Sequence, residues 1–172
     1  MLVLVVCGAI GAFALNRANT TATTSTTSYS TTPTTDQTQT DGKHFKVGET
    51  VKTGDTWEVT VNSAKTSNGD DYEKPDAGNT FIIINVTTHN ISNKEQIVSS
   101  LLNFKLKDSD GTEGKVAFLG TGTSQPPDGK VAAGDQARGD LVYQVSASKK
   151  QFTLSFENDI LQSGQTIWDI NV

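Results

Sequence analysis

The chain has 172 residues, of which 34% are hydrophobic and 19% are charged, with a formal net charge of -5 and one cysteine, Cys7. A single cysteine excludes an intramolecular disulfide, and the length allows at most one domain of ordinary size. No basic cluster is larger than a lysine pair. Phosphate binding depends on grouped Lys and Arg side chains, so nucleic acid is not expected as a partner.

Residues 1–15 are predicted to be a membrane anchor or signal segment, because residues 2–15 form an unbroken run of apolar and small residues. A helix of that length would measure about 21 Å, whereas the hydrocarbon core of a bilayer is about 30 Å thick. Three interpretations stay open: a cleaved signal peptide, a lipoprotein signal acylated at Cys7, and a truncated transmembrane helix. All three predict that the chain beyond this segment lies outside the cytoplasm, tethered to a membrane or secreted.

Residues 16–43 have a different composition, and residues 20–40 alone contain twelve threonines with one proline and one aromatic residue. Such a segment cannot bury enough apolar surface to offset the entropy lost on ordering, so we expect a disordered linker. Ser/Thr-rich tracts with proline behave as extended spacers. The linker is therefore predicted to be a stalk that carries a folded domain of residues 44–172.

From residue 44 onward, apolar residues alternate with polar ones, which is the period of a half-buried strand. The alternating segments are 57–62, 104–107, 141–145, 152–156 and 168–172. Residues 80–88 are apolar on both faces through Ile84, which predicts a central strand covered on both sides. Residues 96–102 fit a short helical turn as well as a strand.

Turns rich in Gly, Pro and Asp separate these segments, and no long helical stripe is present. The sequence therefore predicts an all-β fold, an antiparallel sandwich of about seven or eight strands, preceded by the apolar N-terminal helix and the linker.

The same part of the chain carries an ordered series of strand and turn patterns. They are residues 45–51 (FKVGETV), 54–61 (GDTWEVTV), 78–90 (GNTFIIINVTTHN), 104–111 (FKLKDSDG), Gly134 and Gly139 before 141–143 (LVY), and 168–172 (WDINV). In this order they resemble the bacterial extracellular domain-of-unknown-function family 4352, whose members are sometimes labelled telomeric repeat-binding factor 2. The resemblance implies an immunoglobulin-like sandwich on a membrane-anchored or secreted protein of the bacterial cell envelope, with no catalytic residues to carry over.

Four acidic residues, Asp70, Asp71, Glu73 and Asp76, stand within seven positions and offer the oxygen ligands that calcium prefers. Their spacing matches no standard calcium loop, and acidic runs are usually solvated. No metal or cofactor is therefore predicted, and these four residues are weak candidates only.

Two histidines and two tryptophans are the other residues with the chemistry of a site. His44 and His89 adjoin no nucleophile motif, so no catalytic residue and no enzymatic activity are predicted. Trp57 and Trp168 could stack on sugars, but aromatic residues at alternating strand positions usually belong to the core.

These observations favour a non-catalytic extracytoplasmic module that binds a protein, an envelope polymer or a small ligand. The alternative is a calcium-dependent binding domain that uses the loop of residues 70–76, and a hydrolase comes third. An exposed apolar patch would favour the first function, a convergent carboxylate cage the second, and a cleft holding His89 the third.

Overall fold

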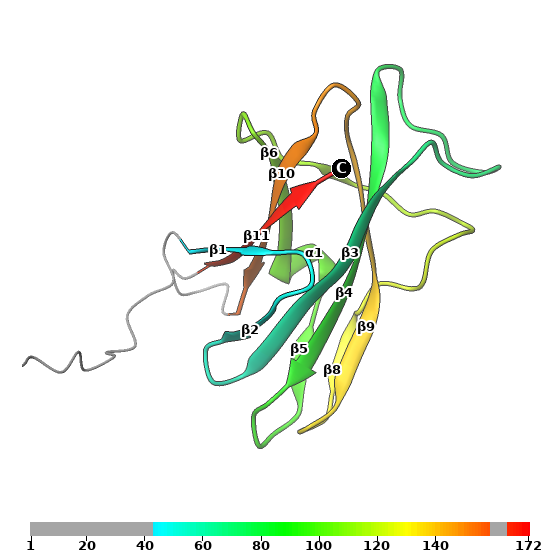
Figure 1. The fold of residues 1–172 in the computed structure, drawn as a ribbon. Coiled ribbons are helices and arrows are strands. Elements are labelled where there is room, and N and C mark those ends of the chain that lie inside the picture. The colour runs from blue at the N-terminus through cyan, green and yellow to red at the C-terminus, as the bar shows by residue number, and fades with distance from the viewer. Residues whose placement is uncertain (1–42, 159–164) are drawn as a thin grey trace, which may run out of the picture. The chain divides into compact units, whose positions relative to one another are not determined.

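The computed structural model describes residues 43–158 and 165–172 (Figure 1). They form eleven strands and one helical turn. The predicted anchor, residues 1–15, and all but the last residue of the predicted stalk lie outside these ranges. Within the described ranges, no helix has both the length and the apolar character needed to cross a membrane.

The strands form two main sheets and a two-stranded one. The first sheet has the order β1 (His44–Lys46), β11 (Gln165–Asn171), β10 (Gln151–Glu157), β6 (Phe104–Asp108). The second has the order β2 (Thr50–Thr53), β3 (Trp57–Ser67), β4 (Asn79–Asn90), β9 (Gln136–Ser146), β7 (Lys115–Val116). The third pairs β5 (Gln96–Val98) with β8 (Gly129–Val131). Figure 1 shows β3, β4 and β9 side by side, with β10 and β11 in the other layer.

The predicted all-β sandwich is confirmed, with more strands than the seven or eight expected. Five of the eleven strands, β1, β2, β5, β7 and β8, have only two to four residues. Strands so short display no alternation that a sequence pattern could reveal. Residues 96–102 contain both structures that the sequence allowed, because β5 is followed by the helical turn α1 (Ser100–Asn103).

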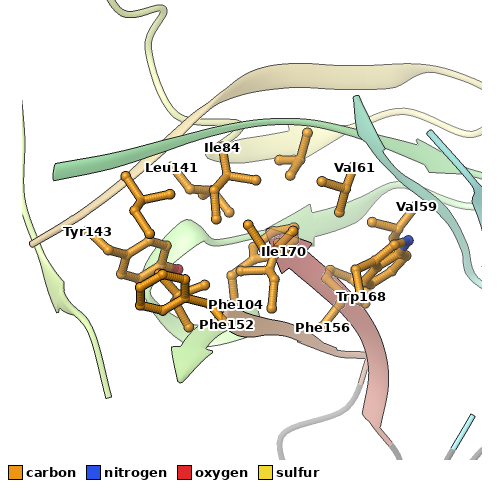
Figure 2. Close-up of a cluster of buried hydrophobic side chains, with 14 of the residues drawn as sticks. Val59, Val61, Ile84, Phe104, Leu141, Tyr143, Phe152, Phe156, Trp168 and Ile170 are labelled. Carbon is orange, nitrogen blue, oxygen red and sulfur yellow. The ribbon is translucent and has the colours of Figure 1, made fainter. Parts of the chain in front are cut away.

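The main core lies between the inner faces of the two large sheets, where apolar side chains from both layers meet (Figure 2). Phe156 is central: its ring centroid lies 5.0 Å from that of Phe104 and 6.5 Å from that of Trp57, in edge-to-face arrangements. Trp168 is fully buried, and its indole N–H donates to the Glu49 carbonyl oxygen. Both tryptophans therefore belong to the core and present no ring to a sugar.

The end of β4 is organised by Asn90, which is fully buried. Its side-chain amide donates to the carbonyl oxygens of Lys94, Val131 and Ala132, and its Oδ1 accepts the backbone N–H of Ser92. Buried polar groups are costly unless they are paired, so these bonds fix the connections on both sides of the β5–β8 pair.

β4 is covered on both faces, as its sequence predicted. Phe81 and Ile83 point to the outer side of the second sheet, where they pack with Val142 of β9. Ala117 and Leu119, from the loop that follows β7, cover this small outer cluster. The loop therefore covers the apolar outer face of the second sheet, as the first sheet covers its inner face.

Candidate functional site

The acidic loop is built around Asp70. Its Oδ1 accepts the backbone N–H groups of Tyr72 and Glu73, each at 2.8 Å, and its Oδ2 accepts that of Thr121, also at 2.8 Å. Hydrogen bonds to the charged form, led by that from Glu73, lower the pKa of Asp70 to about 2. Asp70 thus joins its own loop to the loop that follows β7.

The other acidic residues of this loop do not join Asp70 in a cage. Asp76 turns to β9, where its Oδ2 accepts the side-chain amide of Gln144 at 2.7 Å, and the side chains of Asp71 and Glu73 are exposed. Across residues 43–158 and 165–172, no group of three or more His, Cys, Asp or Glu side chains is placed to hold a metal ion. The structure therefore gives the weak calcium candidates no common centre.

The two histidines face carboxylates. His44 Nδ1 lies 2.6 Å from Asp169 Oδ1, and His89 Nδ1 lies 3.3 Å from Glu58 Oε2. Neither histidine makes a hydrogen bond with a serine or threonine hydroxyl in the described part of the chain, and neither lines the cavity described next. The chemistry of a general base beside a nucleophile is not assembled around them.

A cavity of about 140 Å³ lies against the edge of β9, and we call it the edge pocket. It exists because β7 pairs with only two residues of β9, Gln144 and Tyr143. Beyond them the chain leaves β9 as a long loop, residues 117–128, which is the yellow-green segment that projects beyond β9 in Figure 1. The pocket is the space between this loop and the strand edge that β7 leaves uncovered.

Gly139 of β9 allows the backbone of the loop, residues 117–128, to pass close to the strand. A Cβ atom at this position would lie 2.1 Å from the carbonyl oxygen of Gln125 and 2.7 Å from the backbone of Pro126, which no real side chain tolerates. Glycine is the residue that allows two backbones to approach so closely. The family pattern contained Gly139 without giving it a role, and the structure supplies one.

The lining of the edge pocket is partly apolar and partly polar. Phe118, Leu141 and Val142 contribute apolar surface, while Ser124 and Asp140 contribute polar atoms. Asp140 is the single charged residue among those that line the cavity. The pocket therefore combines an apolar wall with one negative charge.

Asp140 is half-buried and has hydrogen-bond partners but no ion pair. Its Oδ1 accepts the side-chain amide of Asn85 at 2.6 Å, and its Oδ2 accepts the backbone N–H of Ser124 at 2.7 Å. No Lys, Arg or His in the described ranges lies within ion-pair distance of it. An ionised carboxylate offers about four acceptor sites, so roughly half of its capacity is unused.

Tyr143 lies deeper beside the pocket. Burial raises the pKa of its phenol above the ordinary value of 10.0, because the charged form would be poorly solvated. The phenol is therefore neutral throughout the physiological range of pH. It contributes a ring to the pocket and the core, and no second charge.

The rim of the edge pocket exposes large apolar side chains. Phe118 is 65% exposed and Val116 is 37% exposed, and both line the cavity. Leu101 and Leu102, which follow the pocket residue Ser100 in α1, are 57% and 58% exposed. We call these four residues the apolar rim.

Sequence reasoning did not find this site. Its walls come from α1, from β7 with the following loop, and from β9, three stretches of the chain that only the fold brings together. The only local signal was the apolar run of residues 116–119 (VAFL) in an otherwise polar stretch. That run was too short to read as a strand or as a helix.

Solved structures with this arrangement of sheets come from several bacteria. The yjhA protein of Bacillus subtilis is 20% identical with a TM-score of 0.61, over 75% of this chain and 100% of that one. The secreted protein MPT63 of Mycobacterium tuberculosis is 16% identical with a TM-score of 0.53, over 76% of this chain and 97% of that one. At such identities the likeness concerns the fold alone.

A third similar structure belongs to a longer protein. The candidate lipoprotein ycdA of Bacillus subtilis is 16% identical with a TM-score of 0.60, over 74% of this chain. The aligned part spans only 39% of the ycdA chain. No curated protein matches the sequence.

The family expected from the strand and turn patterns is confirmed. The model of the family described as Domain of unknown function (DUF4352) matches residues 45–167, which is most of the chain and nearly all of its described part. The sheets and the edge pocket all lie within or directly beside this match. The chain therefore belongs to the DUF4352 family.

Proposed function

We propose that this protein is a non-catalytic binding module with an immunoglobulin-like sandwich, which acts outside the cytoplasm and is either tethered to a membrane or secreted. The observation that carries the proposal is the apolar rim beside the edge pocket. Exposed large apolar side chains around a cavity are typical of binding surfaces. The partner is a protein, an envelope polymer or a small ligand that covers this rim.

The proposed location outside the cytoplasm is supported by the composition of the N-terminal residues and by the proteins of similar fold. Residues 2–15 have the composition of a targeting or membrane segment, and residues 20–40 have that of a spacer. Proteins with a similar fold are a secreted protein and candidate lipoproteins, including one from Staphylococcus aureus that is 10% identical with a TM-score of 0.52, over 72% of this chain and 92% of that one. A domain so displayed meets partners in the cell envelope or beyond it.

The non-catalytic character is supported by the chemistry of the edge pocket. Asp140 lies there without a histidine, a lysine or a second carboxylate, so the lining supplies no separate base to activate its serine and threonine residues. The acidic domain also offers no grouped cations for a nucleic acid. Binding uses what the pocket has, which is apolar area and one negative charge.

Site-specific crosslinking in living cells tests the proposal. A photoreactive amino acid replaces Phe118 on the rim, and in a matched strain it replaces Lys46, which is exposed on β1 at the edge of the other sheet. We expect discrete crosslinked products from position 118 and none from position 46. External protease should also remove the domain from cells whose wall has been opened. A domain that stays protected as cytosolic proteins do, or equal crosslinking at both positions, would refute the proposal.

A further inference from the structure

We propose that the edge pocket binds a primary ammonium group carried on a short apolar stem, the chemistry shared by a small alkylamine and by a lysine side chain of a partner. The inference rests on the proposed binding function and specifies its ligand. Three features of the pocket carry it: its charge, its hydrogen-bonding groups and its size.

The charge of the pocket selects a cation. Asp140 is a half-buried carboxylate with no ion-pair partner in the described part of the chain, because the nearby Arg138 donates to Asn85 Oδ1 and the Asn85 amide donates to Asp140. A partly desolvated charge gains most from an opposite charge. No Lys, Arg or His lines the cavity to attract an anion. The backbone N–H of Ser124, which could otherwise bind an anion, already donates to Asp140.

The polar lining matches the three N–H donors of an ammonium group. The carboxylate of Asp140 accepts one of them with its unused capacity. Ser124 and Gln125 line the same cavity, and a hydroxyl and a side-chain amide are groups that can accept the others. A guanidinium group is planar and carries five donors, so the small pocket fits it less well.

The size and the apolar wall select a short stem. A cavity of about 150 Å³ is known to hold a benzene molecule, and the edge pocket has about 140 Å³. Phe118 and Val142, the latter two residues from Asp140 on the same face of β9, would contact the apolar stem while the ammonium lies at Asp140. A stem of four carbon atoms, as in n-butylammonium or in the lysine side chain, is accommodated in this space.

Titration of the full chain, labelled with ¹⁵N and kept in a mild non-ionic detergent, measures the binding directly. The probe is n-butylammonium chloride at pH 7, and the controls are n-butanol and sodium butyrate, which have apolar chains of similar length but no positive charge. We expect saturable shifts of the amide signals of Ser124, Asp140 and Leu141, with a Kd on the order of millimolar for so small a ligand. Both controls should bind at least tenfold more weakly.

Two variants and a control locate the binding. Asp140→Asn keeps the shape of the side chain but removes its charge, and should raise the Kd at least tenfold. Phe118→Ala removes part of the apolar wall without touching the carboxylate, and should raise the Kd severalfold. Asp76→Asn removes a carboxylate that lies outside the pocket and should leave the Kd unchanged. Unchanged amide signals in β10 and β11 show that each variant is folded.

The proposal is overturned if butyrate or butanol binds as tightly as butylammonium, or if Asp140→Asn alters the Kd by less than twofold. A lysine blocked at both its amino and carboxyl ends distinguishes the two sources of the ligand. Tighter binding of the blocked lysine than of butylammonium supports a partner's side chain, and weaker binding supports a free amine. The crosslinking at position 118 is a separate measurement, so it can succeed when this titration fails, and the two failures can be told apart.

Discussion

The main core and the small outer cluster are both apolar, but they are held in different ways. In the described part of the chain, nineteen buried residues fill the space between the two large sheets, whereas Phe81, Ile83 and Val142 form the outer cluster. The main core is closed by two hydrogen-bonded layers. The outer cluster is covered by one loop, residues 117–128. Asp70 accepts a hydrogen bond from Thr121 at the tip of this loop, and Gly139 leaves room for its backbone at Gln125. Covering an apolar surface with a loop thus leaves its stability dependent on a few single contacts.

Truncation of the main core should have the largest effect. Phe156→Ala removes a fully buried ring that contacts Trp57 and Phe104, and should lower the free energy of unfolding by about 3–5 kcal/mol. Ile83→Ala in the outer cluster should cost about 2 kcal/mol, at the low end for its type, because the covering loop can relax into the space. Denaturant titration of both variants measures the difference. Equal losses would mean that the loop is as rigid as a sheet.

A side chain at Gly139 should disturb the return of the loop. Gly139→Ala places a Cβ against the backbone of Gln125, and overpacking of this kind costs about 1–3 kcal/mol. The loop of residues 117–128 should also become more sensitive to limited proteolysis. Gly120→Ala is the matched control, since its Cβ would lie 3.3 Å from the exposed and movable Tyr72 ring, and it should change stability by less than about 0.5 kcal/mol. If Gly139→Ala changed neither the stability nor the rate of proteolysis, the loop would not need to approach β9 closely at this position.

The contact at the loop tip should depend on pH. The pKa of Asp70 is lowered from 3.8 to about 2 in the folded chain, so its contribution to stability is fully present above pH 3.8 and is lost as the pH falls toward 2. The difference in Tm between wild type and Asp70→Asn should therefore be largest above about pH 5 and should shrink between about pH 4 and pH 2. Asp71→Asn, which alters an exposed neighbour, is the control and should follow the wild type. A difference in Tm that is constant with pH would contradict the assigned bonds.

Calcium should have the smallest effect. Because Asp70 is committed to three backbone N–H groups and Asp76 turns to Gln144, millimolar calcium should not raise the Tm. Magnesium at the same concentration controls for ionic strength. A rise in Tm with calcium alone that Asp70→Asn abolishes would restore the calcium-dependent binding function.

The sequence was informative where a side chain's environment follows from its place in a strand. The alternation of residues 57–61 predicted which residues are buried, and that of residues 152–156 did so except at Ser155, which is also buried. The doubly apolar start of residues 80–88 predicted cover on both faces. Tertiary contacts between distant segments have no such local signature. The edge pocket was missed for this reason, since its walls meet only after β7, α1 and β9 have been placed.

The sequence pattern also did not predict how the strands pair with one another, residue by residue. The pairing of β3 with β4 shifts between Val61 and Ser63, so that Asn62 is an extra residue and Ala64, opposite Ile84, takes the next inward position. A bulge changes which residues face inward without changing composition. The parallel pairing of β1 with β11 was likewise unpredicted, because a three-residue strand carries too little pattern.

The pairing of β1 with β11 has a mechanical consequence. Tension transmitted along the chain through Lys43 would first load β1, which joins the sheet by three residues opposite Ile167, Trp168 and Asp169. The first contacts to break would be that of His44 with Asp169 and the packing of Phe45 on Trp168, because these residues directly follow Lys43. Detaching β1 would release its three residues from the sheet and leave β10 and β11 paired with each other. Because β1 is the edge strand of its sheet, it could detach under load without breaking the pairing of the other strands.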